Sequence, residues 1–166
     1  MSLNTTPRTW VTGEVVTAAM NNTEIRDALA GIQAGWTSYT PAWTAGANPV
    51  IGNGSIAGAY LQVGKRVDFR IDVTMGSTTT YGSGQWRLSL PTTPVARIWR
   101  WLANCYDASA SGYYGAWAAW LSSGPYAIVW APATTAGNND RAIGAASPFT
   151  WATGDVLSVN GTYENA

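Results

Sequence analysis

The clearest alternation of hydrophobic and polar positions along the chain lies between residues 66 and 73. Four apolar residues (Val67, Phe69, Ile71 and Val73) alternate there with four charged ones (Arg66, Asp68, Arg70 and Asp72). Because successive side chains of a strand point to opposite faces, the pattern predicts a strand with one buried face and one solvated face of paired opposite charges. Residues 55–63 precede it, and the Gly64-Lys65 step predicts a tight hairpin turn between the two segments.

Further short strands are predicted downstream, separated by segments rich in Gly, Ser, Asn and Pro. They fall at residues 85–90, 98–106, 113–121, 126–130 and 156–163. No strand–helix–strand rhythm interrupts the series, so antiparallel connections are expected. The pattern therefore predicts a mainly β domain over residues 36–166, an antiparallel β-sandwich of jelly-roll-like type.

Two of the predicted strands carry apolar residues on both faces. In residues 113–121, Trp117 falls on one face and Trp120 on the other, and residues 98–104 repeat this feature. A strand of a sandwich normally leaves one face to water, so a second apolar face requires a cover. A subunit interface supplies such a cover, and Trp117 and Trp120 are predicted to lie in it.

A helical periodicity marks the N-terminal part of the chain, residues 1–35. After Thr17, which suits a helix N-cap, apolar and amide residues recur at spacings of four and three, as in a coiled coil: Ala18, Asn22, Ile25, Leu29 and Ile32. Gly35 suits the end of this helix. A helix this short is marginal alone. It is expected to bundle with identical copies through Ile25, Leu29 and Ile32 or to dock on another protein; the alternative is an amphipathic helix packed on its own domain.

The composition also favours association between copies of the chain, because the sequence is rich in apolar residues and poor in charged ones. Hydrophobic residues make up 46 % of the sequence and charged residues 11 %, with a formal net charge of +0. Ordinary soluble domains carry about 25 % charged residues. Either Thr, Ser, Asn and Gly make up the surface, or copies of the chain cover much of it, and both can hold. Together with the strands that are apolar on both faces, the low charge leads us to predict a homotrimer. A balanced charge argues against nucleic-acid binding. The longest apolar runs are too short to cross a membrane, and residues 1–10 lack the features of a secretory signal.

Residues with catalytic chemistry are scarce. The chain has no histidine and a single cysteine, Cys105, which is expected to be a buried, inert thiol. The acidic residues form no cluster; Asp107, Asp140, Asp155 and Glu164 are each expected in solvated turns. The sequence therefore predicts no catalytic residue, no metal site and no cofactor, and it disfavours an enzyme such as a cell-wall depolymerase.

Aromatic residues are the unusual feature, with 10 Trp and 8 Tyr but 2 Phe. Trp and Tyr keep a polar group and suit partly solvated surfaces, although most such rings serve core or interface packing. Loops at 107–112, 122–125 and 133–140 flank the aromatic-rich segment and are expected to form one binding end. The candidate ligand-binding residues are Tyr113, Tyr114, Trp130, Asn138, Asn139 and Asp140, with a polysaccharide as the expected ligand.

Three segments resemble a known group of proteins. The run Trp10-Val11-Thr12-Gly13-Glu14, within residues 8–22, and its continuation at 25–27 and 36–44 resemble the opening of minor tail and fibre-type proteins of actinobacterial phages and prophages. Residues 58–67 are similar to a hairpin of phage fibre and receptor-binding domains. Residues 151–164 resemble a closing strand of the same group.

The resemblance implies a virion protein, trimeric, made in the host cytoplasm and assembled into the particle. Residues of about 7–32 would attach it to other virion proteins, and the β domain would face outward as part of a tail tip or tail fibre, in contact with host cell-wall polysaccharide. Two alternatives remain open at this point: a head fibre or capsid decoration protein without a receptor role, and a carbohydrate-binding module.

Overall fold

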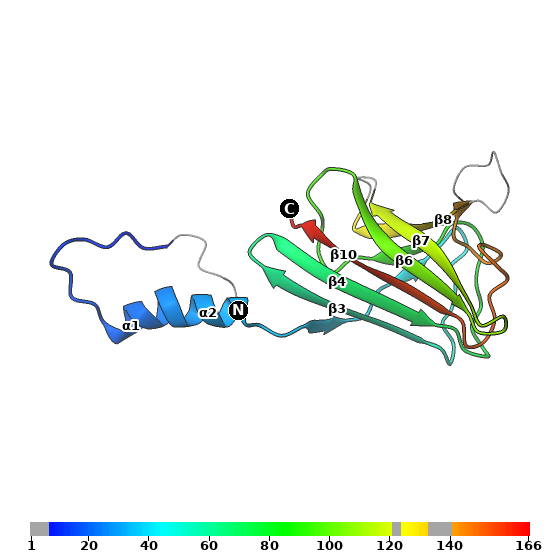
Figure 1. Ribbon diagram of the computed structural model, residues 1–166, viewed down its shortest axis with the longest axis horizontal. Coiled ribbons are helices and arrows are strands. Elements are labelled where there is room, and N and C mark those ends of the chain that lie inside the picture. The colour runs from blue at the N-terminus through cyan, green and yellow to red at the C-terminus, as the bar shows by residue number, and fades with distance from the viewer. Residues whose placement is uncertain (1–6, 121–123, 133–140) are drawn as a thin grey trace.

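The chain forms an N-terminal helical segment and a β domain, as the computed structural model shows for residues 7–120, 124–132 and 141–166 (Figure 1). The helical segment consists of α1 (Ala18–Asn21), the π-helical turn η1 (Asn22–Arg26) and α2 (Asp27–Ile32). The strands are β1 (Thr37–Tyr39), β2 (Trp43–Thr44), β3 (Ser55–Val63), β4 (Arg66–Thr74), β5 (Arg87–Ser89), β6 (Trp99–Asp107), β7 (Gly112–Trp120), β8 (Tyr126–Ala131), β9 (Arg141–Ala142) and β10 (Val156–Glu164). The prediction of a mainly antiparallel β fold after one short helix is confirmed.

The strands of the described residues form one sheet, in the order β1-β3-β4-β10-β6-β7-β8-β5-β2, with β9 paired to β8. The sheet curls on itself (Figure 1), because its two edge strands, β1 and β2, follow each other in the chain. Between these strands, the Ala42 carbonyl accepts a hydrogen bond from the Ser89 backbone N–H over 2.9 Å, and the Ala42 backbone N–H donates to the Ser89 hydroxyl over 2.8 Å. The hydroxyl of Tyr39, at the end of β1, donates to the Ser89 carbonyl of β5 over 3.3 Å. This short link holds the two edges of the curled sheet together.

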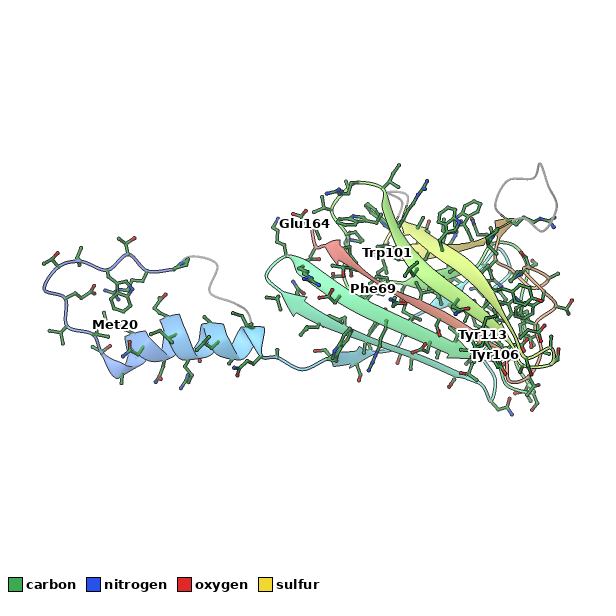
Figure 2. All side chains as sticks on the ribbon, in the orientation of Figure 1. Met20, Phe69, Trp101, Tyr106, Tyr113 and Glu164 are labelled. Atoms are coloured by element: carbon green, nitrogen blue, oxygen red, sulfur yellow. The ribbon has the colours of Figure 1, made fainter. Side chains whose placement is uncertain are left out.

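The core fills the inside of the curl. The predicted apolar face of β4 is fully buried, with Val67, Phe69, Ile71 and Val73 next to residues from β6, β7, β8 and β10. Phe69 packs edge-on against Trp101, with ring centroids 5.1 Å apart (Figure 2). Gly161 on β10 makes room for this indole, since a Cβ there would collide with it. The alternation that predicted β4 therefore identifies the inner face correctly.

The helix begins where the sequence predicts. Thr17 is the N-cap, and its hydroxyl accepts a hydrogen bond of 3.2 Å from the Met20 backbone N–H. The helical conformation ends at Ile32 with Gln33 as C-cap, so Gly35 lies beyond the end and does not terminate the helix. No helix in the described part of the chain is long and apolar enough to span a membrane.

The helix does not pack on its own β domain. It lies to one side of the β domain in Figure 1, and Ile25, Leu29 and Ile32 are exposed by 54 %, 52 % and 56 %. The arm before it runs back along the helix. This arm is held by polar contacts of Arg8, whose guanidinium donates to Glu14 and whose backbone N–H donates to Glu24. In this structure the alternative of a helix packed on its own domain is therefore excluded.

Two acidic side chains expected in solvated turns are buried instead. The Asp155 carboxylate accepts backbone hydrogen bonds from Ala108 at 2.9 Å and Ala152 at 2.6 Å, and the residue is fully buried. The Asp107 carboxylate accepts hydrogen bonds from the Ser109 hydroxyl and from the backbone N–H groups of Ser109 and Ala110. Both carboxylates fix turns at one end of the domain, because each offers acceptors to backbone N–H groups without other partners.

Candidate binding surface

The outer face of β6, β7 and β8 carries the aromatic residues that the core does not use. On β6 the inward residues Trp101, Ala103 and Cys105 are buried, so Arg100, Leu102, Asn104 and Tyr106 point outward. By the same alternation, the outward residues of β7 are Tyr113, Gly115, Trp117 and Ala119. We call this surface of β6 and β7, together with Trp130 on β8, the aromatic face.

The centre of the aromatic face is a stack across three strands. Trp117 and Trp130 are directly paired on β7 and β8, and their rings stack with centroids 5.5 Å apart and planes 9° from parallel. The Arg100 guanidinium, on β6, lies 5.2 Å from the Trp117 ring centroid. Since β7 lies between β6 and β8, Trp117 is flanked by the guanidinium on one side and the second indole on the other. Trp117, which the sequence predicts for a subunit interface, and Trp130, which it predicts for ligand binding, thus form one cluster.

A small apolar pair of residues lies next to this stack, on the same outer side of the sheet. Ala119 and Ile128 are buried there and paired with each other across β7 and β8. Arg87 of β5 pairs with Ile128, and its guanidinium lies 4.9 Å from the Tyr126 ring centroid. The second apolar face of β7 is therefore partly covered within the single chain, by aromatic residues and arginines of neighbouring strands.

Beside the stack, the aromatic face is open. Gly115 faces outward between Tyr113 and Trp117, and nothing lies within 4 Å of the position its Cβ would take. Tyr113 is 74 % exposed and packs against Tyr106, with ring centroids 4.8 Å apart, at the end of the domain away from the helix (Figure 2). Asn104 is paired with Gly115, and Leu102, paired with Trp117, is 72 % exposed. These residues form a notch with a glycine floor, apolar walls and one amide.

Other predicted site residues lie elsewhere. Tyr114 points away from Tyr113 and packs on Phe149, with ring centroids 4.9 Å apart. Trp120 is buried in the core of the single chain, where its indole N–H donates to the Gly124 carbonyl, so its burial needs no second subunit. Asn138, Asn139 and Asp140 lie outside the described residues. Of the proposed ligand set, only Tyr113 and Trp130 are shown on the aromatic face.

The expectation that three loops form one binding end is wrong for two of them. The β6–β7 turn after Asp107 lies at the end away from the helix, near Tyr106 and Tyr113 (Figure 2). Because β7 then runs the length of the domain, Trp120 at its end lies at the opposite end, and so do Gly124 and Pro125, which precede β8. The segment 133–140 is outside the described residues. The candidate surface is therefore a sheet face rather than a set of loops.

Charge is distributed unevenly over the outer side of the sheet. On the β4 and β10 half, Asp68 forms an ion pair with Arg66 at 2.9 Å and accepts from Thr162, and Asp72 accepts from Ser158 at 2.7 Å. Partial burial tends to raise the pKa of Asp68, but the hydrogen bonds from Thr162 and Arg66 lower it overall. On the β5 to β8 half the charged outward side chains are Arg87 and Arg100, and the described residues provide no carboxylate for either.

A second concave feature lies at the end of the β domain nearer the helix, where Glu164 is labelled in Figure 2. It is a shallow groove of about 230 Å³ lined by Lys65, Arg66, Trp99, Thr162, Tyr163 and Glu164. The Arg97 guanidinium lies 4.7 Å from the Trp99 ring centroid. Sequence reasoning missed this groove because its walls come from three separate parts of the chain, the β3–β4 turn, the start of β6 and the end of β10.

No nucleophile stands out among the described residues. Cys105 is fully buried, as predicted, and burial raises the pKa of its thiol to about 12. The thiolate that would react is therefore scarce at neutral pH. In the described ranges no three His, Cys, Asp or Glu side chains are grouped so that they could hold a metal ion.

Comparison of the chain with protein-family models, with curated proteins and with solved structures gives no match.

Proposed function

We propose that this chain is a homotrimeric structural component of a virion, at the tail tip or in a tail fibre, with a β domain that contacts the host cell surface. The observation that carries the proposal is the exposed apolar stripe of Ile25, Leu29 and Ile32 on a helix separate from the β domain. The resemblance of residues 8–22 to the opening of phage tail and fibre-type proteins supports the same assignment.

The stripe supports attachment because a helix of this kind is incomplete alone. Residues 18–32 form one short helical stretch, and their three largest apolar side chains are each more than half exposed. Isolated helices shorter than about 12–15 residues are marginal in water, and most helix stability in proteins comes from packing an apolar face. Identical helices in a bundle, and the virion proteins that receive them, would provide that packing.

The β domain supports an outward role because its fold needs no partner. Its core is closed within one chain, and Tyr39 of the edge strand β1 donates to the carbonyl of Ser89 on β5, which pairs with the other edge strand, β2. The aromatic face can therefore remain available while the helix is held in the particle. A rigid sheet that carries Tyr113, Leu102 and Trp117 suits contact with an extended molecule at a cell surface.

Substitution of the stripe tests the proposal directly. Replacing Ile25 and Leu29 together by Asp places two charges in the bundle seam, so the protein should become monomeric by light scattering and be lost from assembled particles. The control replaces Asn21 and Gln33 by Asp, which adds the same charge at exposed helical or C-cap positions outside the stripe. Near-UV circular dichroism checks that the β domain stays folded. Full occupancy of the Ile25/Leu29 variant in particles would overturn the attachment role.

A further inference from the structure

The aromatic face combines an open notch with two arginines stacked on aromatic rings. The positive charge of these arginines is the first feature that points to a ligand. Arg100 lies over Trp117 and Arg87 over Tyr126. Within the described part of the chain neither guanidinium forms an ion pair or a hydrogen bond. Each arginine can still present donors from the edge of its planar group, since stacking on a ring leaves those N–H groups free to reach an anion.

The stacking of both arginines on aromatic rings also lowers the entropic cost of binding a ligand. A guanidinium already held against a ring loses less conformational freedom when it grips a ligand than a free side chain does. Arg100 is further fixed because its ring partner, Trp117, is itself stacked on Trp130 at 5.5 Å. This arrangement favours bidentate recognition of a carboxylate or phosphate, for which the planar fork is the best matched group.

The notch favours a sugar next to that anion. Gly115 leaves its floor open, the ring of Tyr113 forms one wall, and Leu102 and Trp117 form the other. Along β7 the Cα atoms of Tyr113 and Trp117 are separated by about 13 Å at normal strand rise, enough for sugar units between the walls. The exposed Asn104 amide, which can donate and accept, matches hydroxyl groups.

Charge complementarity argues for a foreign anion rather than a second copy of this chain. The carboxylates on the outer side of the described β4 strand are already used, Asp68 by Arg66 and Thr162 and Asp72 by Ser158. Asp107 and Asp155 are committed to backbone N–H groups. A copy of the chain that approached Arg100 with any of these four carboxylates would therefore have to break its own contacts in order to neutralise the guanidinium.

We propose that the aromatic face, from Tyr113 to Arg100, binds an acidic polysaccharide. A sugar ring occupies the Gly115 notch against Tyr113, and its carboxylate or phosphate group binds the Arg100 guanidinium. This inference rests on the proposed function, since it names the class of host-surface polymer that the β domain contacts. It assigns no role to the groove beside Lys65 and Trp99.

The test is calorimetric titration of the full chain with four defined probes. Tetragalacturonate presents carboxylates on sugar rings, and an oligosaccharide of mannose 6-phosphate presents phosphates on sugar rings. The methyl ester of tetragalacturonate keeps the sugars without the charge, and polyglutamate keeps the charge without sugars. At least one of the first two should bind, and the last two should bind roughly tenfold or more weakly, as expected when charge-assisted hydrogen bonds or ring contacts are lost.

Three variants localise the site. Gly115→Val fills the notch at an unobstructed position and suits a strand, so it should fold normally and weaken binding roughly tenfold or more. Arg100→Gln removes the charge and should act similarly. Arg70→Gln is the matched control: it removes an arginine that also stacks on an indole, that of Trp36 at 5.0 Å, but on the half of the sheet that carries acids. It should leave binding unchanged.

Each other result overturns the inference. Equal losses of affinity for Arg100→Gln and Arg70→Gln would mean that net charge alone attracts the ligand. If the methyl ester bound as tightly as the acidic sugars, the anion would play no part in binding. If polyglutamate bound as tightly, the sugar would play no part. Binding of neither acidic polymer, or a change of oligomeric state caused by Gly115→Val, would replace a ligand surface by a contact between copies. Incorporation of these variants into particles is measured in parallel. Normal incorporation without saccharide binding overturns this inference and leaves the virion role standing.

Discussion

The helix at residues 18–32 and the strand β10 are both amphipathic segments, yet they place their apolar side chains in opposite environments. Leu157, Val159 and Tyr163 of β10 are buried between β4 and β6. Leu29 and its neighbours in the stripe are exposed by more than half. Large apolar side chains therefore contribute to the stability of the single chain in β10, but they contribute almost nothing to it in the helix.

The difference shows that the two regions depend on different partners. The β domain completes its core within one chain, because its sheet curls until both edges meet. The backbone N–H of Arg8 ties the arm to the helical segment through Glu24, and such a contact at an exposed site is worth little. The apolar stripe of the helical segment can contribute free energy only on association, so stability should be independent of protein concentration in one region and dependent on it in the other.

The largest expected effect comes from the buried side of this comparison. Leu157→Ala removes a fully buried side chain from the centre of the sheet, and the cavity should lower the free energy of unfolding by about 2–5 kcal/mol. Urea unfolding followed by tryptophan fluorescence measures the change, which should be the same at low and high protein concentration. A loss below about 1 kcal/mol would mean that the core is loosely packed and would weaken the contrast with the helix.

A somewhat smaller effect is expected for a buried polar group. Asp155→Ala leaves the backbone N–H groups of Ala108 and Ala152 without their acceptors in a buried turn, and should cost about 1–3 kcal/mol. Asp72→Ala, at an exposed position of β4, is the matched control and should change stability by less than about 0.5 kcal/mol. Equal losses for the two variants would contradict the structural role assigned to Asp155.

The role of Asp155 illustrates where sequence reasoning reaches its limit. The sequence predicts β4, β6, β7, β8 and β10 closely, because each is a long alternating or apolar run bounded by segments rich in Gly, Ser, Asn or Pro. It predicts the Thr17 cap because capping depends on a few neighbouring residues. Asp155 looked like a solvated turn residue, and its burial follows from Ala108, a residue 47 positions away that only the fold brings near. The short strands β1, β2 and β9 contain too few residues to show any period.

The candidate surface could be predicted only in part for the same reason. The density of aromatic residues in that segment points to Tyr113 and Trp130, but the stack of Trp117 on Trp130 depends on the register of β7 and β8. Register also places Arg100 over Trp117 and opens the notch at Gly115. A continuous apolar run does not say which face of β7 is covered within the chain, so Trp117 and Trp120 were both assigned to an interface although they point in opposite directions.

A modest, pH-dependent effect is expected at the solvated side of β4. Because hydrogen bonds from Thr162 and Arg66 lower the pKa of Asp68 in the folded protein, its carboxylate contributes stability that is present above the unfolded pKa near 4 and is lost as the pH falls through the lower folded value. Asp68→Asn should therefore cost about 0.5–1 kcal/mol at pH 7, a size typical of an exposed ion pair, and the deficit should vanish in strong acid. Unfolding of both proteins between pH 2 and 7 measures it. A deficit that does not change with pH would assign the loss to packing.

The smallest expected effect is also the one that separates the two regions most clearly. Leu29→Ala is the same chemical change as Leu157→Ala, but it removes a side chain that is 52 % exposed, from a helix that alanine favours. In a dilute, monomeric sample the free energy of unfolding of the β domain should change by less than about 0.5 kcal/mol, because no core contact is lost. At concentrations where the wild type associates, the variant should instead dissociate at a higher protein concentration by light scattering, since each buried Leu contributes to the helix bundle. If Leu29→Ala destabilised the dilute monomer as strongly as Leu157→Ala, the helix would belong to the folded core of a single chain, and the stripe could not serve as a free attachment surface.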